Sequence, residues 1–414
     1  MKRHQSWRLA ALAAFCLLAV FAGSAPALAA SKPKAATGPA IKIGAICTCS
    51  GPLESGIKAA KTLDEAWVKW TNANGGINGR PVKLTILDDA GDATKAAAAA
   101  RQLVQQVKPV AIVGNYSLQT DAWIAIAQEA GVPVIGGGGQ SRAEFSNPDF
   151  FGTGSSSFPG LYRAILSAKQ DGKKKLAILY CAEAPICASF PRVISAFANR
   201  IGRITVGASS RIAASQPSFA ANCLAGKNSG ADASFISTSS AVVVRVLQEC
   251  RQQGWVPTMI GGNGTIGINQ SKQIGKSDVL ITTPSLGVTD KTTAGGKLLH
   301  SILAKYAPSL TKGDLYTEAI GAPFAGLQLF ATVAKNVKLK PTSTSADVKR
   351  GLYALKGETV GGLTGPLTYT RGQPTMVACS FVSTYKDGTW KADPRAKCLS
   401  AATVQSIKDV LGIK

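Results

Sequence analysis

The chain has 414 residues, a length that fits two or three domains of about 150 residues each. Hydrophobic residues make up 45% of the chain and charged residues 17%, a composition that is typical of globular proteins and excludes an intrinsically disordered chain. Lysine and arginine outnumber aspartate and glutamate by 46 to 23, but they are spread along the chain without interleaved aromatic residues, which argues against nucleic-acid binding. His4 and His300 are the only histidines, which argues against a histidine-rich metal site or a serine–histidine triad.

Residues 1–29 have the pattern of a secretory signal peptide. A basic start precedes an apolar run over 9–21, and Ala27-Leu28-Ala29 forms a cleavage motif, with Ala25-Pro26-Ala27 as an alternative. The apolar run is shorter than the roughly 20 residues of a spanning helix. Phe15 precedes Cys16, where a lipoprotein would have a small residue. We therefore expect an exported protein, in the periplasm or at an extracellular surface, cleaved near Ala29 and continuing into a disordered leader over 30–40.

The next segments alternate between short apolar runs and helical spacing. Strands are expected over 41–46, 82–87, 110–113 and 132–135, and helices over 57–72, 92–107 and 119–130. Asp92 is placed to cap the second of these helices.

The same alternation continues toward the C-terminus. Helices are expected over 161–169, 190–201, 241–253, 297–306, 325–337 and 346–354, strands over 176–180, 231–236 and 258–260, and short strands with turns over 363–390. Strands separated by helices of 10–15 residues predict parallel sheets. The strands are too many for one ordinary sheet, so the predicted fold class is α/β with two doubly wound lobes. Ligands of such sheets bind at the carboxyl ends of the strands.

Eight cysteines follow the N-terminal segment, an even number that suits disulfides in an oxidising compartment. Local pairing gives Cys47–Cys49, Cys181–Cys187, Cys223–Cys250 and Cys379–Cys398, although the sequence alone allows 105 connectivities. The alternative, a thiolate metal site, lacks the two closely spaced cysteine pairs that zinc sites use. We therefore expect disulfides and no metal site.

Signatures of catalysis are scarce. The segment 262–267 matches G-x-G-x-x-G, but 268–276 does not predict the helix that a dinucleotide site requires. Asp88-Asp89 follows a strand and is interpreted as a solvated turn. No catalytic residues and no cofactor are therefore expected.

Small or hydroxyl residues stand at four expected strand ends, namely at Ser117 and over 136–139, 237–240 and 261–264. Glycine lets a ligand approach the backbone closely, and hydroxyl groups suit capture of a small polar ligand. The repetition of this pattern predicts a ligand-binding edge.

The order of several motifs resembles the branched-chain amino-acid type, LivJ-like, substrate-binding proteins of ABC importers. The opening segments 41–44 and 50–53 are similar to the family's first strand and ligand loop, and 71–82, TNANGGINGRPV, carries its most specific turn. Further similar segments are Asp88-Asp89, 110–114, 131–135 and 362–367, so the resemblance covers about 41 to 390.

The resemblance implies two lobes of the type I periplasmic-binding fold, joined by three crossovers that close on a ligand. The expected N-terminal lobe comprises 41–156 and 284–368, and the expected C-terminal lobe comprises 157–283 and 369–414. The resemblance also implies a monomer that delivers a small-molecule ligand to a membrane permease. No nucleic acid is expected as a partner, and no enzymatic reaction is expected.

Carried over by position, the first lobe's ligand-binding residues are Glu54, Ser55, Tyr116, Ser117, Gly138, Gly139 and Gln140, and the second lobe's are Thr238, Ser239 and Asn263. Asn263 stands where the family has an acidic partner for the ligand's amino group. A neutral amide cannot supply that charge-assisted bond. Either Glu54 replaces it, or the ligand has no amine.

The expected function is that of an exported receptor for a small polar or amphipathic ligand, such as an amino-acid-like compound or a related carboxylate or amide. The alternative is an extracytoplasmic sensor that presents its ligand to a signalling receptor without transport.

Overall fold

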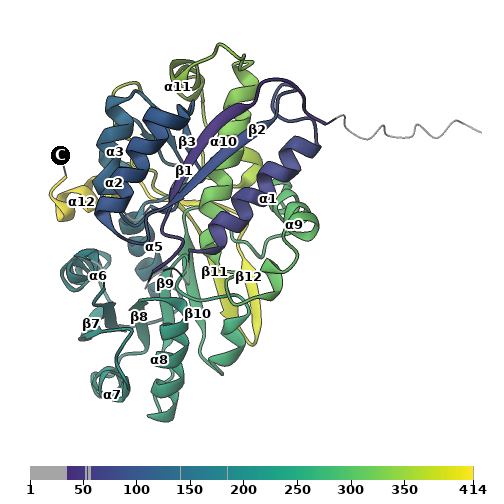
Figure 1. Ribbon diagram of the computed structural model, residues 1–414. Helices are drawn as coiled ribbons and strands as arrows, with labels where there is room; N and C mark the ends of the chain where they lie inside the picture. Colours follow the sequence, from purple (N-terminus) through teal and green to yellow (C-terminus); the bar gives the residue numbers. More distant parts are fainter. Residues whose placement is uncertain (1–34, 52–53, 55–56, 140, 184, 414) are drawn as a thin grey trace, which may run out of the picture. The chain divides into compact units, whose positions relative to one another are not determined.

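A computed structural model describes residues 35–51, 54, 57–139, 141–183 and 185–413, all within the unit Lys34–Lys414 (Figure 1). The expected signal peptide and its cleavage site lie outside the described residues. Part of the expected leader is held in place: the amide of Ala36 donates to the carbonyl of Asn72 at 3.1 Å and that of Thr37 to Gly79 at 3.0 Å. The expectation of disorder up to residue 40 is therefore wrong for these positions.

The first sheet has five parallel strands in the order β2-β1-β3-β4-β5. Its strands are β1 (Ile41–Cys47), β2 (Val82–Asp88), β3 (Ile112–Val113), β4 (Val134–Ile135) and β5 (Phe150–Phe151). Successive side chains of a strand point to opposite faces. Accordingly Ile112, Val134 and Phe150 enter one hydrophobic core, and the residue after each enters the other.

Helices cover both faces of this sheet. One core includes residues of α1 (Ala59–Ala73), α9 (Ala294–Tyr306), α10 (Gly321–Asn336) and α11 (Ser345–Tyr353). The other includes residues of α2 (Ala93–Gln102) and α3 (Thr120–Glu129), which lie side by side in Figure 1. This is the doubly wound arrangement expected from the alternating pattern.

The second sheet has the order β12-β11-β10-β9-β8-β6-β7, with β13 paired to β11. Its strands are β6 (Lys175–Cys181), β7 (Thr205–Ile212), β8 (Ala233–Ser237), β9 (Thr258–Gly262), β10 (Val279–Thr283), β11 (Cys379–Lys386), β12 (Thr389–Ala392) and β13 (Lys397–Cys398). Strands β6 to β10 are parallel, whereas β11 runs antiparallel to β10. The predicted α/β fold with two doubly wound sheets is confirmed.

Two cores again sandwich this sheet. The core on one face includes residues of α5 (Ser157–Gln170), α6 (Phe190–Ile201) and α12 (Ala401–Leu411). The core on the other includes residues of α7 (Ala220–Asn228) and α8 (Ser240–Gln252). The remaining short elements are η2 (Leu103–Val107), α4 (Ala143–Ser146), η3 (Pro185–Ser189), η4 (Gln270–Gln273), η5 (Leu310–Lys312), η6 (Glu318–Ile320) and η7 (Val360–Gly362).

Several elements differ from the sequence-based expectation. The helix expected over 92–107 is α-helical only to Gln102, and then continues as the π-helical segment η2. Helix α5 begins at Ser157 rather than at Leu161. β5, β7, α7, β10 and α12 were not expected; β7 is a polar edge strand whose residues alternate between exposed and half-buried, so it lacks an apolar pattern.

Within the described residues, the chain passes between the two sheets three times, over 152–156, 284–293 and 368–378. The structure contains the disulfides Cys47–Cys49, Cys181–Cys187, Cys223–Cys250 and Cys379–Cys398. The exact limits of the two lobes stay a prediction.

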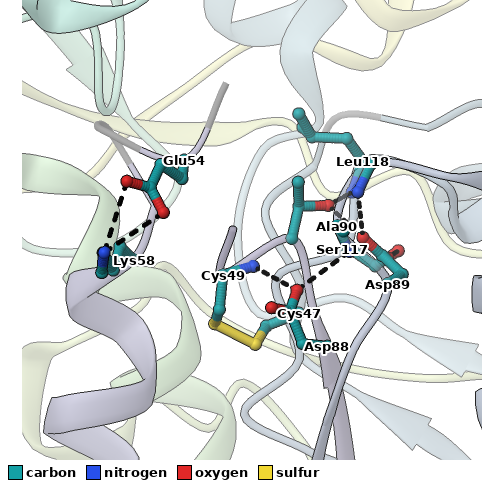
Figure 2. Close-up of a disulfide and its surroundings, with 11 residues drawn as sticks. Cys47, Cys49, Glu54, Lys58, Asp88, Asp89, Ala90, Ser117 and Leu118 are labelled. Carbon is teal, nitrogen blue, oxygen red and sulfur yellow. Dashed lines mark hydrogen bonds and ion pairs between the residues drawn. A yellow bond between two sulfur atoms is a disulfide. The ribbon is translucent and has the colours of Figure 1, made fainter. Parts of the chain in front are cut away.

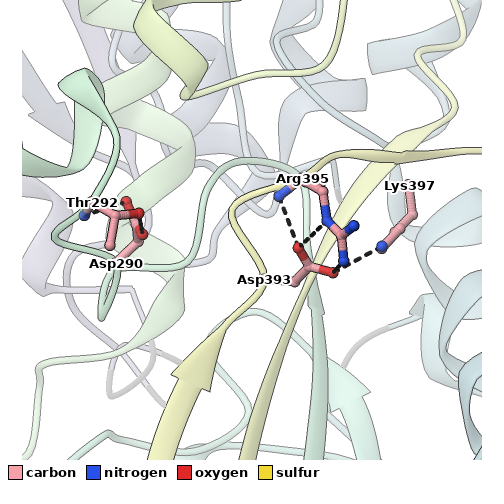
Figure 3. Close-up of polar contacts among 5 residues, drawn as sticks. All are labelled: Asp290, Thr292, Asp393, Arg395 and Lys397. Carbon is pink, nitrogen blue, oxygen red and sulfur yellow. Dashed lines mark hydrogen bonds and ion pairs between the residues drawn. The ribbon is translucent and has the colours of Figure 1, made fainter.

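Near β13, Asp393 pairs with two cations of the same segment (Figure 3). Its carboxylate accepts from Arg395 Nε at 3.2 Å and lies 2.8 Å from Lys397 Nζ. Burial alone would raise the pKa of Asp393, but the hydrogen bonds from Lys397 and Arg395 outweigh it and lower the pKa to about 2.

Among the described residues, no helix combines the length and the apolar character that crossing a membrane requires.

Candidate functional site

A cavity of about 170 Å³ lies where the strand ends of the two sheets face each other. The first sheet's side contributes Ile57, Tyr116, Leu118 and Gly138. The second sheet's side contributes the segments that follow β8 and β9, together with the start of α5. This is the edge at which doubly wound sheets bind ligands.

Five of the sequence-predicted residues line this cavity: Tyr116, Gly138, Thr238, Ser239 and Asn263. Three others, Glu54, Ser117 and Gly139, do not line it in the structure. Ser55 and Gln140 lie outside the described residues.

The Ser117 hydroxyl takes part in a buried hydrogen-bond network (Figure 2). This hydroxyl donates to Asp89 Oδ2 at 2.5 Å. The same hydroxyl accepts from Trp123 Nε1 at 3.2 Å. The other carboxylate oxygen of Asp89 accepts from Thr48 Oγ1 at 2.7 Å. Asp89 is fully buried, so the interpretation of Asp88-Asp89 as a solvated turn is wrong for this residue. A buried carboxylate requires such partners, and Ser117 is one of them.

Glu54 does not line the cavity and instead pairs with Lys58, the residue that precedes α1. Its carboxylate lies 3.3 Å from Lys58 Nζ, and the side chains of Glu54 and Lys58 are 33% and 51% exposed (Figure 2). Partly exposed ion pairs of this kind contribute little stability. The structure thus shows Glu54 with a cationic partner within the protein.

The glycines after β4 have two different roles. A Cβ on Gly138 would lie 2.8 Å from the Tyr116 ring, so only glycine permits this close approach. Gly139 adopts φ +71, and its amide donates to Glu144 Oε2 at 2.6 Å. Gly138 therefore shapes the wall of the cavity, while Gly139 supports it through a buried carboxylate.

One hydrogen bond joins the two sides of the cavity directly. Asn263 Nδ2, from the loop after β9, donates to the Tyr116 hydroxyl at 3.0 Å. These two positions are 147 residues apart in sequence. The carbonyl oxygen of the Asn263 amide is an acceptor, with no charge to offer a cation.

Two helices begin at the cavity. Ser155, Ser156 and Ser157 line it at the start of α5, and Ser237–Ser239 line it at the start of α8. The N-cap residues Ser156 and Ser239 make no side-chain capping bond. The Ser156 hydroxyl, on a residue only 5% exposed, has no hydrogen-bond partner among the described residues.

Sequence reasoning missed the serines at the start of α5. They follow β5, a strand of only two residues, Phe150–Phe151, which has too few residues to show a strand pattern. Recognising Phe-Phe as a buried strand would have placed 155–157 at a carboxyl strand end, beside the sites already singled out.

The remaining wall is apolar. It includes Leu161, Phe190, Phe235, Ile236 and the disulfide Cys181–Cys187. Cys181 ends β6, and the bond closes the segment between β6 and η3.

No Asp, Glu, Lys, Arg or His side chain lines the cavity within the described part of the chain. In the same residues, no group of three or more His, Cys, Asp or Glu side chains is placed to hold a metal. The cavity thus offers neutral hydrogen-bonding groups at one part and an apolar surface at another, a combination that suits a small amphipathic molecule.

Comparison with known proteins agrees with this arrangement. The family model described as "Periplasmic binding protein" matches residues 40–389. A Pseudomonas aeruginosa protein named "Amino acid binding protein" is 43% identical over 65 residues, which are 16% of this chain and only 17% of that protein.

Solved structures of low sequence identity share the fold. A branched-chain amino acid ABC transporter protein from Thermus thermophilus, with bound valine, superimposes with a TM-score of 0.75 at 14% identity, over 90% of this chain and 98% of that one. The substrate-binding protein LivJ from Streptococcus pneumoniae, in complex with isoleucine, gives 0.68 at 20% identity, over 87% and 99%. The family model spans most of the chain, and we conclude that this protein belongs to the periplasmic binding protein family.

Proposed function

We propose that this protein is an exported receptor that captures a small polar or amphipathic molecule in the cavity and delivers it to the permease of an ABC importer. The observation that carries the proposal is the cavity itself, whose lining comes from both sheets and joins neutral polar groups to an apolar wall. Relatives of known structure include proteins named as branched-chain amino acid transport components, which supports a transport role.

Binding would be coupled to closure of the two lobes about the three chain passages. The Asn263–Tyr116 hydrogen bond already connects the two sides, and a ligand that contacts both sides adds to this connection. A ligand stabilises whichever conformation it binds more tightly, so it would favour the closed form. The permease would then distinguish loaded from empty receptor by this form.

Export is part of the same proposal. The disulfides of the structure suit an oxidising compartment, and the signal-peptide pattern over 1–29 agrees with them. We propose a monomer that acts without a cofactor and without catalysing a reaction.

A thermal-shift screen of amino acids, carboxylic acids and amides tests the receptor role. A ligand that binds only the folded state raises stability by about 2.7 kcal/mol at a concentration of 100 times Kd. We expect one chemical group of solutes to raise the melting temperature by several degrees. A screen of several hundred such solutes with no shift would contradict the receptor function.

A further inference from the structure

The absence of charged side chains from the described lining of the cavity limits the class of ligand that it can bind. The described lining contains no Asp, Glu, Lys, Arg or His side chain. The residues of the internal loops outside the described ranges, Pro52, Leu53, Ser55, Gly56, Gln140 and Ala184, are not ionisable either.

Two acidic residues close in sequence to the lining have partners elsewhere in the protein. Glu54 pairs with Lys58 at 3.3 Å. Glu183 accepts from the amide of Ala214 at 2.6 Å and from that of Ala182 at 3.0 Å. Neither lines the cavity, so a buried ammonium group would find no carboxylate partner there, which is strongly unfavourable.

An anion, in contrast, finds favourable groups. Helices α5 and α8 both begin at the cavity, and the N-terminus of a helix carries a partial positive charge with unpaired amide donors. Ser156 adds a second observation, because this residue lines the cavity and its buried hydroxyl has no partner among the described residues. Buried polar groups are normally hydrogen-bonded, so this hydroxyl fits a group that the ligand supplies.

The size and the apolar wall limit the rest of the molecule. An apolar cavity of about 150 Å³ accepts a benzene ring. At about 170 Å³, with Leu161, Phe190 and Phe235 in its wall, this cavity suits one branched aliphatic or aromatic group beside a small polar head.

From these observations we propose that the ligand is a small aliphatic or aromatic carboxylate without an amino group. Its carboxylate would lie at the starts of α5 and α8 and accept a hydrogen bond from Ser156. Its apolar part would pack against the side chains of Phe190 and Phe235. This inference rests on the receptor function proposed above and specifies the substrate class of that site.

Matched pairs of solutes that differ only by the amino group test the inference by isothermal titration calorimetry on the mature protein. The pairs are 4-methylpentanoate with leucine, and 3-phenylpropanoate with phenylalanine. We expect the amine-free member of at least one pair to bind at least tenfold more tightly than its amino acid. Equal or tighter binding of the amino acids overturns the inference. Absence of binding by all four also overturns it, and the wider thermal-shift screen decides separately whether the receptor function stands.

Two substitutions test the residues named. Asn263→Asp adds a carboxylate to the cavity and is expected to shift the affinity ratio of the better pair at least tenfold toward the amino acid. Ser156→Ala is expected to weaken carboxylate binding at least fivefold with little change in melting temperature, because the hydroxyl caps no amide. Ser400→Ala is the matched control: its hydroxyl caps α12 by accepting from the Thr403 amide, so stability falls and affinity does not. An unchanged ratio with Asn263→Asp, or unchanged affinity with Ser156→Ala, contradicts the placement of the carboxylate.

Discussion

Glu318 shows how a single buried side chain ties the passage 284–293 to η6. Its Oε2 accepts from the amide of Val288 at 2.6 Å. The Tyr316 hydroxyl donates to the carbonyl of Val288 at 2.8 Å. Burial is the largest influence on Glu318, and it raises the pKa to about 7 even though hydrogen bonds from Ser383 and Val288 lower it. The carboxyl group is therefore protonated in the folded protein at mildly acidic pH.

This shift predicts a loss of stability as the pH rises. The folded-state pKa lies above the unfolded value of about 4.3, so the contribution of Glu318 is complete below that value and is lost as the pH passes through about 7. Glu318→Gln cannot titrate and retains an amide oxygen for the Val288 amide. Between pH 5 and pH 8, the free energy of unfolding of the wild type should fall relative to this variant by up to about 3 kcal/mol. Urea unfolding at several pH values measures the difference.

Asp393→Asn is the control for that experiment. Asp393 has its pKa lowered to about 2, so its contribution is present above the unfolded value and is lost only as the pH falls toward 2. Its removal should leave the pH dependence between 5 and 8 unchanged. Identical pH profiles for the wild type and Glu318→Gln would show that Glu318 does not titrate in this range.

At the scale of single residues, sequence patterns identify some residues of the cavity and misplace others. Tyr116, Gly138 and Asn263 were placed near a ligand by resemblance and strand-end position, and they line the cavity. Ser117 follows the same rule, but its hydroxyl is required by the buried Asp89, a partner 28 residues away in sequence. No local pattern predicts such a contact, because it depends on which strands become neighbours.

At the scale of the element, the disulfide Cys181–Cys187 closes the short segment after β6 and lines the cavity. Cys223–Cys250 instead joins α7 to α8 inside a hydrophobic core, and neither of its cysteines lines the cavity. We therefore expect the first bond to support ligand binding and the second to support the stability of the fold.

Replacing both cysteines of each bond by alanine tests this difference. The chain-entropy relation gives a stability loss of about 2 kcal/mol for the shorter loop and about 3.5 kcal/mol for the longer one. Cys181→Ala with Cys187→Ala should weaken ligand binding at least tenfold, because the wall loses its fixed shape. Cys223→Ala with Cys250→Ala should lower the melting temperature more and leave affinity unchanged. Calorimetric titration and thermal melts measure both quantities, and equal effects on affinity would contradict this assignment.

Whether an element can be predicted from local sequence depends on whether it is buried on one face or on both. Helix α6 was expected over the residues that form it, because its apolar residues repeat at helical spacing and Val193, Ile194 and Phe197 are buried. Strand β10 is fully buried, so its sequence Val279–Thr283 has no alternation to reveal it. Short or edge strands such as β5 and β7 owe their structure to the neighbouring strands, which the local sequence does not specify.

At the scale of the whole molecule, a long-range pattern predicted more than any local one. Alternating strands and helices indicated two doubly wound sheets, and the structure has a five-stranded parallel sheet and a second, mixed sheet. The pattern could not reveal which side chains meet across the cavity, since Tyr116 and Asn263 belong to different sheets and approach only in the folded chain.

Gly262 allows the cavity itself to be blocked. It ends β9 and lines the cavity, and a Cβ built there would meet no atom within 4 Å. Gly262→Leu should therefore fill space that the ligand needs without disturbing the surrounding packing. Gly313→Leu makes the same chemical change away from the cavity, where a Cβ would have only ordinary contacts at 3.7 and 3.8 Å.

Native mass spectrometry of these two variants and the wild type, each mixed with the solute that gives the largest thermal shift, is the most direct measurement of the central claim. The account predicts that the wild type and Gly313→Leu gain the mass of one solute molecule, and that Gly262→Leu gains none while keeping its melting temperature within a few degrees of the wild type. Binding of the solute by a folded Gly262→Leu as tightly as by the wild type would contradict the claim that the ligand lies between the two sheets.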